Sequence, residues 1–168
     1  MIHGFDPIAG PDARVLILGS VPSDRSLAEQ RYYAHPRNSF WTIMLSLFGG
    51  GAYLDYATCL EMLQRSKVAV WDVLKAAERH GSLDSAIVSA TAVPNDIAGF
   101  LVAHPQVATV FFNGEKAEAL FRKHITPTLR SGTEPRLVRL PSTSPANAAV
   151  SLHAKLEQWE VVVAATRS

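Results

Sequence analysis

The chain contains a single cysteine, Cys59, among its 168 residues. One thiol cannot form an intramolecular disulfide, and it cannot supply the ligands of a multi-cysteine zinc or iron–sulfur site. Charge is also scarce, because charged residues make up 18% of the sequence and the formal net charge is +1. Any affinity for nucleic acid therefore has to come from a local group of cations rather than from the overall charge.

Long apolar runs are missing as well, and we expect no signal peptide. No run approaches the roughly 20 apolar residues that span a bilayer. The first ten residues, MIHGFDPIAG, lack the basic region and apolar stretch of a signal peptide. Hydrophobic residues make up 48% of the chain, which favours a folded protein over a disordered one. We expect one domain over residues 1–168, located in the cytoplasm and without a membrane partner.

Four short apolar segments have the composition of buried strands. They are RVLILGS from Arg14, KVAVWDV from Lys67, VATVFFNG from Val107 and RLVRLPS from Arg136. Segments with helical spacing lie between and after them, at residues 40–48, 53–65, 94–104, 114–124 and 152–163. The three glycines at 49–51 should end the first helix, and Pro94 should lie near the start of the third. This alternation predicts an α/β fold with a parallel sheet covered on both faces.

Polar, small or aromatic residues follow each predicted strand. In parallel sheets of this kind, ligands bind beyond the carboxyl ends of the strands, so these residues are the candidates for a site. They form the segments GSVPS at 19–23 with YYAHPRNSFW at 32–41, WDV at 71–73, FNG at 112–114 and LPSTSPAN at 140–147. We expect the four groups to meet at one rim of the sheet.

Each of these features also has a purely structural interpretation. Residues 19–23 could be a plain strand-to-helix turn or could bind a phosphate or carbonyl oxygen through backbone N–H groups; they lack the G-x-G-x-x-G fingerprint. Asn38 could cap a helix, and Asp72 and Asn113 could be paired within the fold or could bind a ligand. The loop at 140–147 could be only stiff, or it could enter a DNA groove. Nearby cations could form a solvated face or contact DNA: Arg122, Lys123, Arg130, Arg136 and Arg139, against one acidic residue, Glu134.

The segments LILGSVPS, YYAHPRNSFW, VFFNG and LPSTSPANA, in this order, resemble the uracil-DNA glycosylase superfamily. They are most similar to its hypoxanthine (deoxyinosine) DNA glycosylase branch. The segment AHPRNSFW is also similar to a motif of the mismatch-specific uracil glycosylases. The resemblance covers roughly residues 14–159, and its most specific parts are YYAHPRNSFW and LPSTSPAN.

The resemblance implies a three-layer α/β/α sandwich with a central four-stranded parallel sheet. It implies a monofunctional DNA glycosylase that flips a deaminated base out of double-stranded DNA, hydrolyses the N-glycosidic bond and leaves an abasic site. Members of the branch need no metal and no cofactor, so we expect none here. We expect a monomer, and single-stranded DNA remains an alternative substrate.

The resemblance also assigns roles to individual residues. Two residues are expected to act in catalysis, Asn38 and Asn113. The flipped base is expected to be bound by Gly19, Ser20, Tyr33, His35, Phe40 and Asp72, with Phe40 as the stacking platform. The DNA backbone is expected to contact Ser23, Ser142, Thr143, Ser144, Pro145 and Asn147.

The sequence departs from the family pattern at two positions. Many relatives have an Asp or Asn that positions the water after the first strand, whereas this chain has Ser20 there. Uracil-specific relatives have a hydrogen-bond donor at the position of Leu140, which predicts a preference for hypoxanthine over uracil. The alternatives are a mismatch-specific uracil glycosylase and a catalytically inert DNA- or base-binding relative. A nucleotide-processing enzyme is disfavoured, because the chain has no Gly-rich phosphate loop and no cluster of metal ligands.

Overall fold

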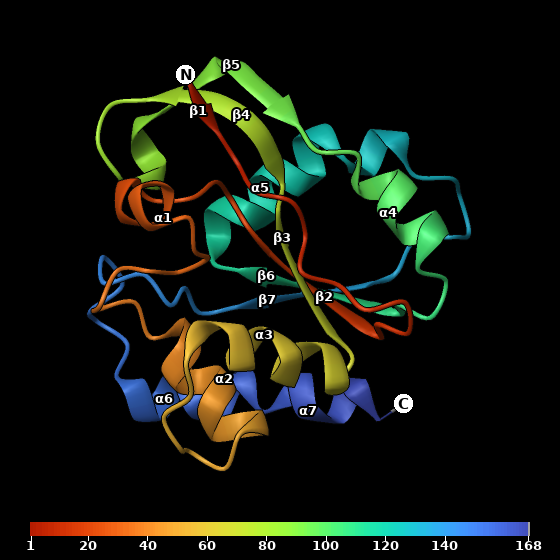
Figure 1. Cartoon of the computed structure of the whole chain (residues 1–168). Coiled ribbons are helices and arrows are strands. Elements are labelled where there is room, and N and C mark those ends of the chain that lie inside the picture. The colour runs from red at the N-terminus through yellow and green to blue at the C-terminus, as the bar shows by residue number, and fades with distance from the viewer. Residues whose placement is uncertain (168) are drawn as a thin grey trace.

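A four-stranded parallel sheet forms the centre of the computed structural model, which describes residues 1–167 (Figure 1). Its strands follow the order β3 (Val68–Asp72), β2 (Val15–Gly19), β6 (Thr109–Asn113) and β7 (Arg136–Leu140). The register pairs Gly19 with Asp72 and Asn113 with Leu140, so the carboxyl ends of the strands lie along one rim. The four predicted strands and their parallel arrangement are confirmed.

Helices cover both faces of this sheet, as Figure 1 shows. One face carries α2 (Phe40–Phe48), α3 (Tyr56–Arg65), α6 (Leu152–Trp159) and α7 (Val161–Thr166). The other carries α4 (Ile97–Ala103) and α5 (Glu115–His124), and α1 (Asp24–Glu29) lies above the rim. The predicted three-layer α/β/α sandwich is therefore confirmed. None of the helices within residues 1–167 combines the length and apolar composition needed to cross a bilayer.

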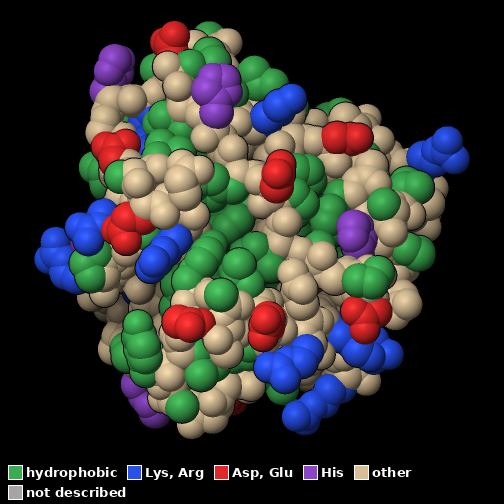
Figure 2. All heavy atoms as spheres, viewed as in Figure 1, with side chains coloured by type: hydrophobic (Ala, Val, Ile, Leu, Met, Phe, Trp, Pro, Cys, Tyr) green, Lys and Arg blue, Asp and Glu red, His purple; other side chains and the backbone are tan. Residues whose placement is uncertain are grey.

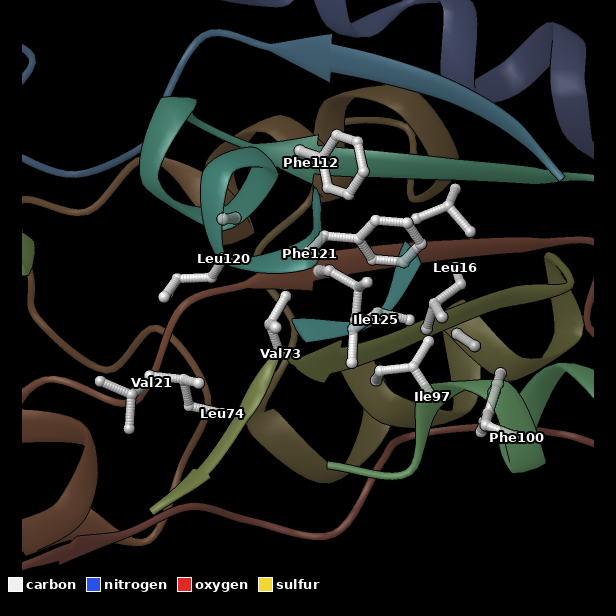
Figure 3. Close-up of a cluster of buried hydrophobic side chains, with 14 of the residues drawn as sticks. Leu16, Val21, Val73, Leu74, Ile97, Phe100, Phe112, Leu120, Phe121 and Ile125 are labelled. Atoms are coloured by element: carbon white, nitrogen blue, oxygen red, sulfur yellow. The ribbon is translucent and has the colours of Figure 1, made fainter. Parts of the chain in front are cut away.

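The alternation of side chains along β2 explains the two cores. Leu16 and Leu18 pack into one buried cluster, with Phe112 from β6 and Phe121 from α5 (Figure 3). Val15 and Ile17 point to the opposite face and belong to a second cluster. Successive residues of a strand face opposite sides, so a strand buried on both sides has to be apolar throughout.

A second, antiparallel sheet was not predicted from the sequence. It consists of β1 (Ile2–His3), β4 (Leu74–Arg79) and β5 (Ile87–Pro94), in the order β1–β4–β5. Strand β4 begins two residues after β3 ends, so the chain passes from one sheet into the other. The connection between β4 and β5 contains a single 3-10 turn at Asp84–Ala86, and a similar turn at Thr126–Thr128 follows α5.

Two helix starts differ from the prediction because of local capping. Helix α3 begins at Tyr56 rather than at residue 53, since the Asp55 side chain accepts a hydrogen bond from the Thr58 N–H at 2.8 Å. Pro94 lies near the start of α4 but outside the helix: it is the last residue of β5, and α4 begins at Ile97 after the cap Asp96.

The C-terminal helical segment is two helices rather than one. Helix α6 ends at Trp159, and α7 begins at Val161 after Glu160. The break shifts which residues of the second helix face the core. Val162 is fully buried, whereas the predicted apolar face contained Val163. The predicted end of α2 is confirmed, because the helix stops at Phe48 and Gly49 follows as its cap.

Candidate active site

A cavity of about 750 Å³ opens at the carboxyl ends of the parallel strands. This volume lies within the range of ordinary small-molecule sites. Most of the residues predicted for the site line it: Gly19, Ser20, Ser23, Tyr33, Asn38, Asp72, Asn113, Ser142, Thr143, Ser144 and Asn147. Three predicted residues do not line it, namely His35, Phe40 and Pro145. The structure therefore brings together residues that lie up to 128 positions apart in the sequence.

Two buried polar atoms point to the part of the cavity next to Gly19. Asp72 Oδ2 and Tyr33 Oη are buried, and neither has a hydrogen-bond partner among the described residues. A Cβ on Gly19 would lie 2.5 Å from Asp72 Oδ1 and 2.8 Å from Tyr33 Oη, so only glycine leaves room for both oxygens. Burying an unpaired polar atom is costly, and such atoms are typically satisfied by a ligand at a functional site.

The pKa of the Asp72 carboxyl group lies well above the usual range of an aspartate. Burial, with the negative charge of Asp84 second, raises the pKa of Asp72 to about 7, while the charge of Arg79 opposes the shift. The protonated carboxyl group has one O–H donor and one acceptor oxygen side by side. It can therefore pair with a ring that presents an adjacent N–H and C=O.

Tyr33 covers the ring that was expected to stack on the base. The Tyr33 and Phe40 rings are stacked, with centroids 4.1 Å apart and planes inclined by 21°. Phe40 is fully buried, and Tyr33 lies between it and the cavity. Tyr33 also has a left-handed backbone, with φ of 53°, which is uncommon for a residue other than glycine. The stacking role of Phe40 stays a prediction, which in this conformation would require Tyr33 to move.

Asn38 lies directly before the N-cap of α2, Ser39, and lines the cavity. Its Oδ1 accepts a hydrogen bond from the Phe40 N–H at 3.0 Å, and its backbone N–H donates to the His35 carbonyl oxygen at 2.9 Å. The N-cap of α2 is Ser39, which makes no side-chain capping hydrogen bond, so Asn38 is not the cap itself but supports the first N–H of the helix from the residue before it. The contact also indicates which side-chain atom of Asn38 is the oxygen. The amide Nδ2 has no hydrogen-bond partner within residues 1–167, and the oxygen keeps a second lone pair. The amide can therefore hold a water or a polar ligand group in the cavity.

Asn113 is occupied in holding the loop that follows β7. Its Nδ2 donates to Thr143 Oγ1 at 3.0 Å, and its Oδ1 accepts from the Thr143 N–H at 2.9 Å. The carbonyl oxygen of Thr143 in turn accepts a hydrogen bond from the Ser39 N–H at 3.0 Å. Thr143 thus joins the ends of β6 and β7 to the start of α2, and the first contribution of Asn113 to the site is to position this loop.

The rest of the loop at residues 142–147 is fixed by its own side chains. Ser142 Oγ accepts from the Ser144 N–H at 3.1 Å, and Asn147 Nδ2 donates to the Ser142 carbonyl oxygen at 3.1 Å. Trp159 on α6 supports the loop from below, since its Nε1–H donates to the Pro141 carbonyl oxygen at 3.0 Å. These contacts, together with Pro141 and Pro145, restrict the loop, as the two prolines of residues 140–147 predict.

A second groove adjoins this loop and shares Ser144 with the cavity. Two cations line it together with hydroxyl groups: its lining residues include Arg37, Ser39, Ser144, Pro145 and Lys155. The Lys155 side chain is largely buried and forms no ion pair with another described residue, and burial lowers its pKa. An unpaired lysine beside an arginine and hydroxyls is suited to a phosphate group.

The cations singled out in the sequence are partly neutralised. Arg122 and Arg139 both pair with Glu118, at 3.3 and 3.6 Å. Figure 2 shows one face of the molecule, on which Lys and Arg side chains are interspersed with Asp and Glu side chains. Arg139 also lines the cavity, so of these five cations it is the one that the structure brings to the site.

Sequence reasoning missed two carboxylates at the cavity, those of Asp84 and Glu115. Ser20, which stands where many relatives carry an acid, is buried and donates a hydrogen bond to Asp84 Oδ1 at 2.5 Å. No sequence signal could place Asp84, because it lies on the turn between two strands of the antiparallel sheet.

The remaining predicted residues have local contacts: His35 Nδ1 accepts from the Arg37 N–H, and Ser23 Oγ accepts from the Ser26 N–H as the cap of α1.

Comparisons with known proteins identify the family. The model of the "Uracil DNA glycosylase superfamily" matches residues 7–164. The chain belongs to the uracil DNA glycosylase superfamily. It is 36% identical over 162 residues to a Methanosarcina acetivorans protein named "Hypoxanthine DNA glycosylase", covering 95% of this chain and 96% of that protein. A Methanosarcina barkeri protein of the same name is 36% identical over 120 residues, which are 68% of this chain and 72% of that protein.

A solved structure supports the same assignment. The solution NMR structure of a Methanosarcina acetivorans protein, provisionally named a uracil DNA glycosylase, matches with a TM-score of 0.79 and 33% identity. The match covers 99% of this chain and 98% of the other. As a member of the uracil DNA glycosylase superfamily, the chain is a DNA glycosylase, a hydrolase of N-glycosyl bonds. Within the described part of the chain, no three His, Cys, Asp or Glu side chains are grouped as metal ligands.

Proposed function

We propose that the chain is a monofunctional hypoxanthine DNA glycosylase. It flips the deaminated base out of double-stranded DNA, hydrolyses its N-glycosidic bond and leaves an abasic site. The observation that carries the proposal is the cavity at the strand ends, where the buried, unpartnered Asp72 Oδ2 and the apolar Leu140 belong to one lining. The name of the Methanosarcina relatives supports the same substrate.

Asp72 and Leu140 provide the chemical basis for the choice of base. A protonated Asp72 donates to O6 of hypoxanthine and accepts from its N1–H, which forms two hydrogen bonds. Uracil presents an equivalent N–H and C=O pair, so Asp72 alone does not separate the two bases. Uracil also has an O2 oxygen, and Leu140 offers it no donor, which costs uracil about 1–3 kcal/mol. Hypoxanthine has no exocyclic oxygen at C2 and loses nothing at this position.

The chemical step needs little acid–base chemistry from the protein. As the bond breaks, positive charge builds on the sugar and negative charge on the base, and preorganised polar groups stabilise both. Asn38 cannot accept a proton near neutral pH, so it acts by holding the attacking water in line. Backbone N–H groups near Ser20, with Asn113, steady the charge on the departing base. The segments that follow the four parallel strands, at residues 19–23 with 32–41, 71–73, 112–114 and 140–147, contain no lysine. No Schiff base therefore forms, and borohydride should trap no protein–DNA adduct.

The DNA partner follows from the same chemistry. Flipping costs a few kcal/mol of unpairing and least at a mismatch, so an inosine–thymine pair favours selection. Cations at the second groove, Arg37 and Lys155, make the affinity for DNA depend on salt. We further propose that the protein acts as a cytoplasmic monomer on double-stranded DNA, and a single-stranded substrate is the alternative to be compared in the same assay.

An assay of base release tests the proposal. End-labelled duplexes with one deoxyinosine, deoxyuridine or deoxyxanthosine are incubated with the protein and then cleaved with alkali at abasic sites. We expect cleavage at deoxyinosine that Asn38→Ala abolishes and Asn38→Ser strongly reduces, although a serine hydroxyl can also accept the hydrogen bond from the Phe40 N–H. Thr42→Ala, on the exposed side of the same helix, is the matched control and should leave cleavage unchanged.

The other outcomes identify the rival functions. Cleavage of the deoxyuridine duplex with intact deoxyinosine would identify a mismatch-specific uracil glycosylase and contradict the proposal. Binding of the deoxyinosine duplex without cleavage of any substrate would identify a catalytically inert relative. Gel-shift measurements on the same duplexes show whether the protein binds a duplex that it does not cleave.

A further inference from the structure

The segment GSVPS at residues 19–23, called the first motif below, lacks the acid that many relatives have at the position of Ser20, but a carboxylate lies against it. Ser20 follows the last residue of β2 and is almost fully buried at the cavity. Its hydroxyl donates to Asp84 Oδ1 over 2.5 Å. A distance this short is typical of a hydroxyl bound to an ionised carboxylate. Asp84 is exposed and lines the same cavity as Asn38.

The turn that carries Asp84 is tied to the rest of the fold. Ser82 Oγ accepts a hydrogen bond from the Asp24 N–H at 3.2 Å, at the start of α1. Arg79, at the end of β4, forms an ion pair with Asp24 at 3.1 Å and donates to the Gly81 carbonyl oxygen. Arg79 is therefore paired with Asp24, and Asp84 has no ion-pair partner among the described residues.

The charge of Asp84 acts on the inner part of the cavity. It contributes to raising the pKa of Asp72 and, after burial and Asp72, the pKa of Tyr33. Among the carboxyl groups that line the cavity, Asp72 is buried beside an unpartnered hydroxyl, whereas Asp84 and Glu115 are exposed to solvent. Asp84 is the one that is hydrogen-bonded to Ser20. Pairs of acids that the surroundings separate in this way commonly divide two roles between them.

We propose that Asp84, oriented by Ser20, is the catalytic carboxylate that replaces the missing acid of the first motif. It faces the deoxyribose of the flipped nucleotide and stabilises the positive charge that forms there. The N-glycosidic bond breaks with its electron pair on the base, which regains a proton from solvent. The water held by Asn38 forms the new O–C1′ bond and passes its proton to the Asp84 carboxylate, from which it returns to solvent. Ser20 is a positioning residue.

The competing interpretation is that Asp84 only anchors its turn to Ser20. Asp84→Asn separates the two, because asparagine keeps an oxygen that accepts the Ser20 hydrogen bond but carries no charge. Asp24→Asn is the matched control, since it weakens the ion pair that holds the same turn and leaves the cavity charge in place. Thermal unfolding of both variants establishes that they are folded.

Two measurements test the proposal, which rests on the proposed glycosylase function. The first is the single-turnover rate on a deoxyinosine duplex. The second is the ratio of affinities for two duplexes, one with a cationic pyrrolidine in place of the abasic sugar and one with neutral tetrahydrofuran. The second measurement needs no turnover, so it still tests the Asp84 charge if the wild-type protein releases no base and the proposed function fails.

We expect the wild-type protein to bind the pyrrolidine duplex at least about tenfold more tightly than the tetrahydrofuran duplex. Asp84→Asn should reduce this ratio to about one and slow the single-turnover rate by about 10- to 100-fold, less than a fully buried group would, because solvent screens an exposed charge. Ser20→Ala should slow the rate less and retain part of the ratio. Asp24→Asn should change neither. An unchanged ratio and rate in Asp84→Asn, or equal losses in Asp24→Asn, would overturn the proposal.

Discussion

Replacing Asp72 by asparagine should change how the stability of the protein depends on pH. In the folded protein, burial and the Asp84 charge raise the pKa of Asp72 to about 7, whereas an unfolded aspartate titrates near ~3.9. Between these two values the folded state keeps a proton that the unfolded state has released, so a rise in pH favours unfolding. Three pKa units correspond to about 4 kcal/mol, which is an upper limit for the stability lost between pH 4 and pH 8.

Asp72→Asn removes this titration and keeps a donor and an acceptor of similar size at the same place. The free energy of unfolding of the variant should therefore gain on the wild type as pH rises, by up to about 4 kcal/mol at pH 8 compared with pH 4. The difference should level off above pH 7, where the folded state is ionised too. Urea titrations of both proteins at half-unit steps from pH 4 to pH 8.5 measure it.

Asp12→Asn, on an exposed turn, is the matched control, and its stability should follow the wild-type pH dependence. A difference in the free energy of unfolding between Asp72→Asn and the wild type that stays constant over the whole pH range would refute the raised pKa of Asp72. A wild-type stability that increases relative to the variant as pH rises would also refute it, because that result would mean that Asp72 is ionised and well paired in the folded protein.

Three further variants test the packing and charge of the site. Tyr33→Phe removes a buried hydroxyl without a partner, so it should raise stability by about 1 kcal/mol in urea unfolding, and a loss would show that the hydroxyl is paired. Asn113→Ala leaves the Thr143 N–H without its acceptor and should cost about 2–3 kcal/mol; a cost below about 0.5 would contradict the anchoring role. Arg37→Ala and Lys155→Ala should each lower the slope of log affinity against log salt by about one on any duplex, and unchanged slopes would exclude phosphate contacts.

The central sheet could be predicted because its strands are buried on both faces. A strand such as Val15–Gly19 has to be apolar at every position, and that pattern is visible without knowing its neighbours. The second sheet has no such signal. Its strand β4 has the sequence LKAAER, which consists of good helix formers, and only the pairing with β5 makes it a strand.

The candidate site could be predicted as far as it follows the parallel strands. Asn38, Asp72 and Asn113 all lie at the cavity, as the rule for strand ends requires. The contacts within the site could not be predicted, because they depend on backbone geometry that the sequence does not display. Tyr33 stacks on Phe40 from a left-handed backbone, and Asp84 reaches Ser20 from a turn of the unpredicted sheet.

The most direct test of the account is the ratio of single-turnover rates on two duplexes that differ only in the target base. One carries deoxyinosine and the other deoxyuridine, opposite the same base in both duplexes. The comparison is made once with thymine and once with guanine as the opposite base, and mass spectrometry identifies the released base. The account predicts free hypoxanthine, released at least about fivefold faster than uracil, which corresponds to the lower end of the cost of about 1–3 kcal/mol for the missing hydrogen bond at Leu140. Release of uracil at an equal or higher rate would contradict it.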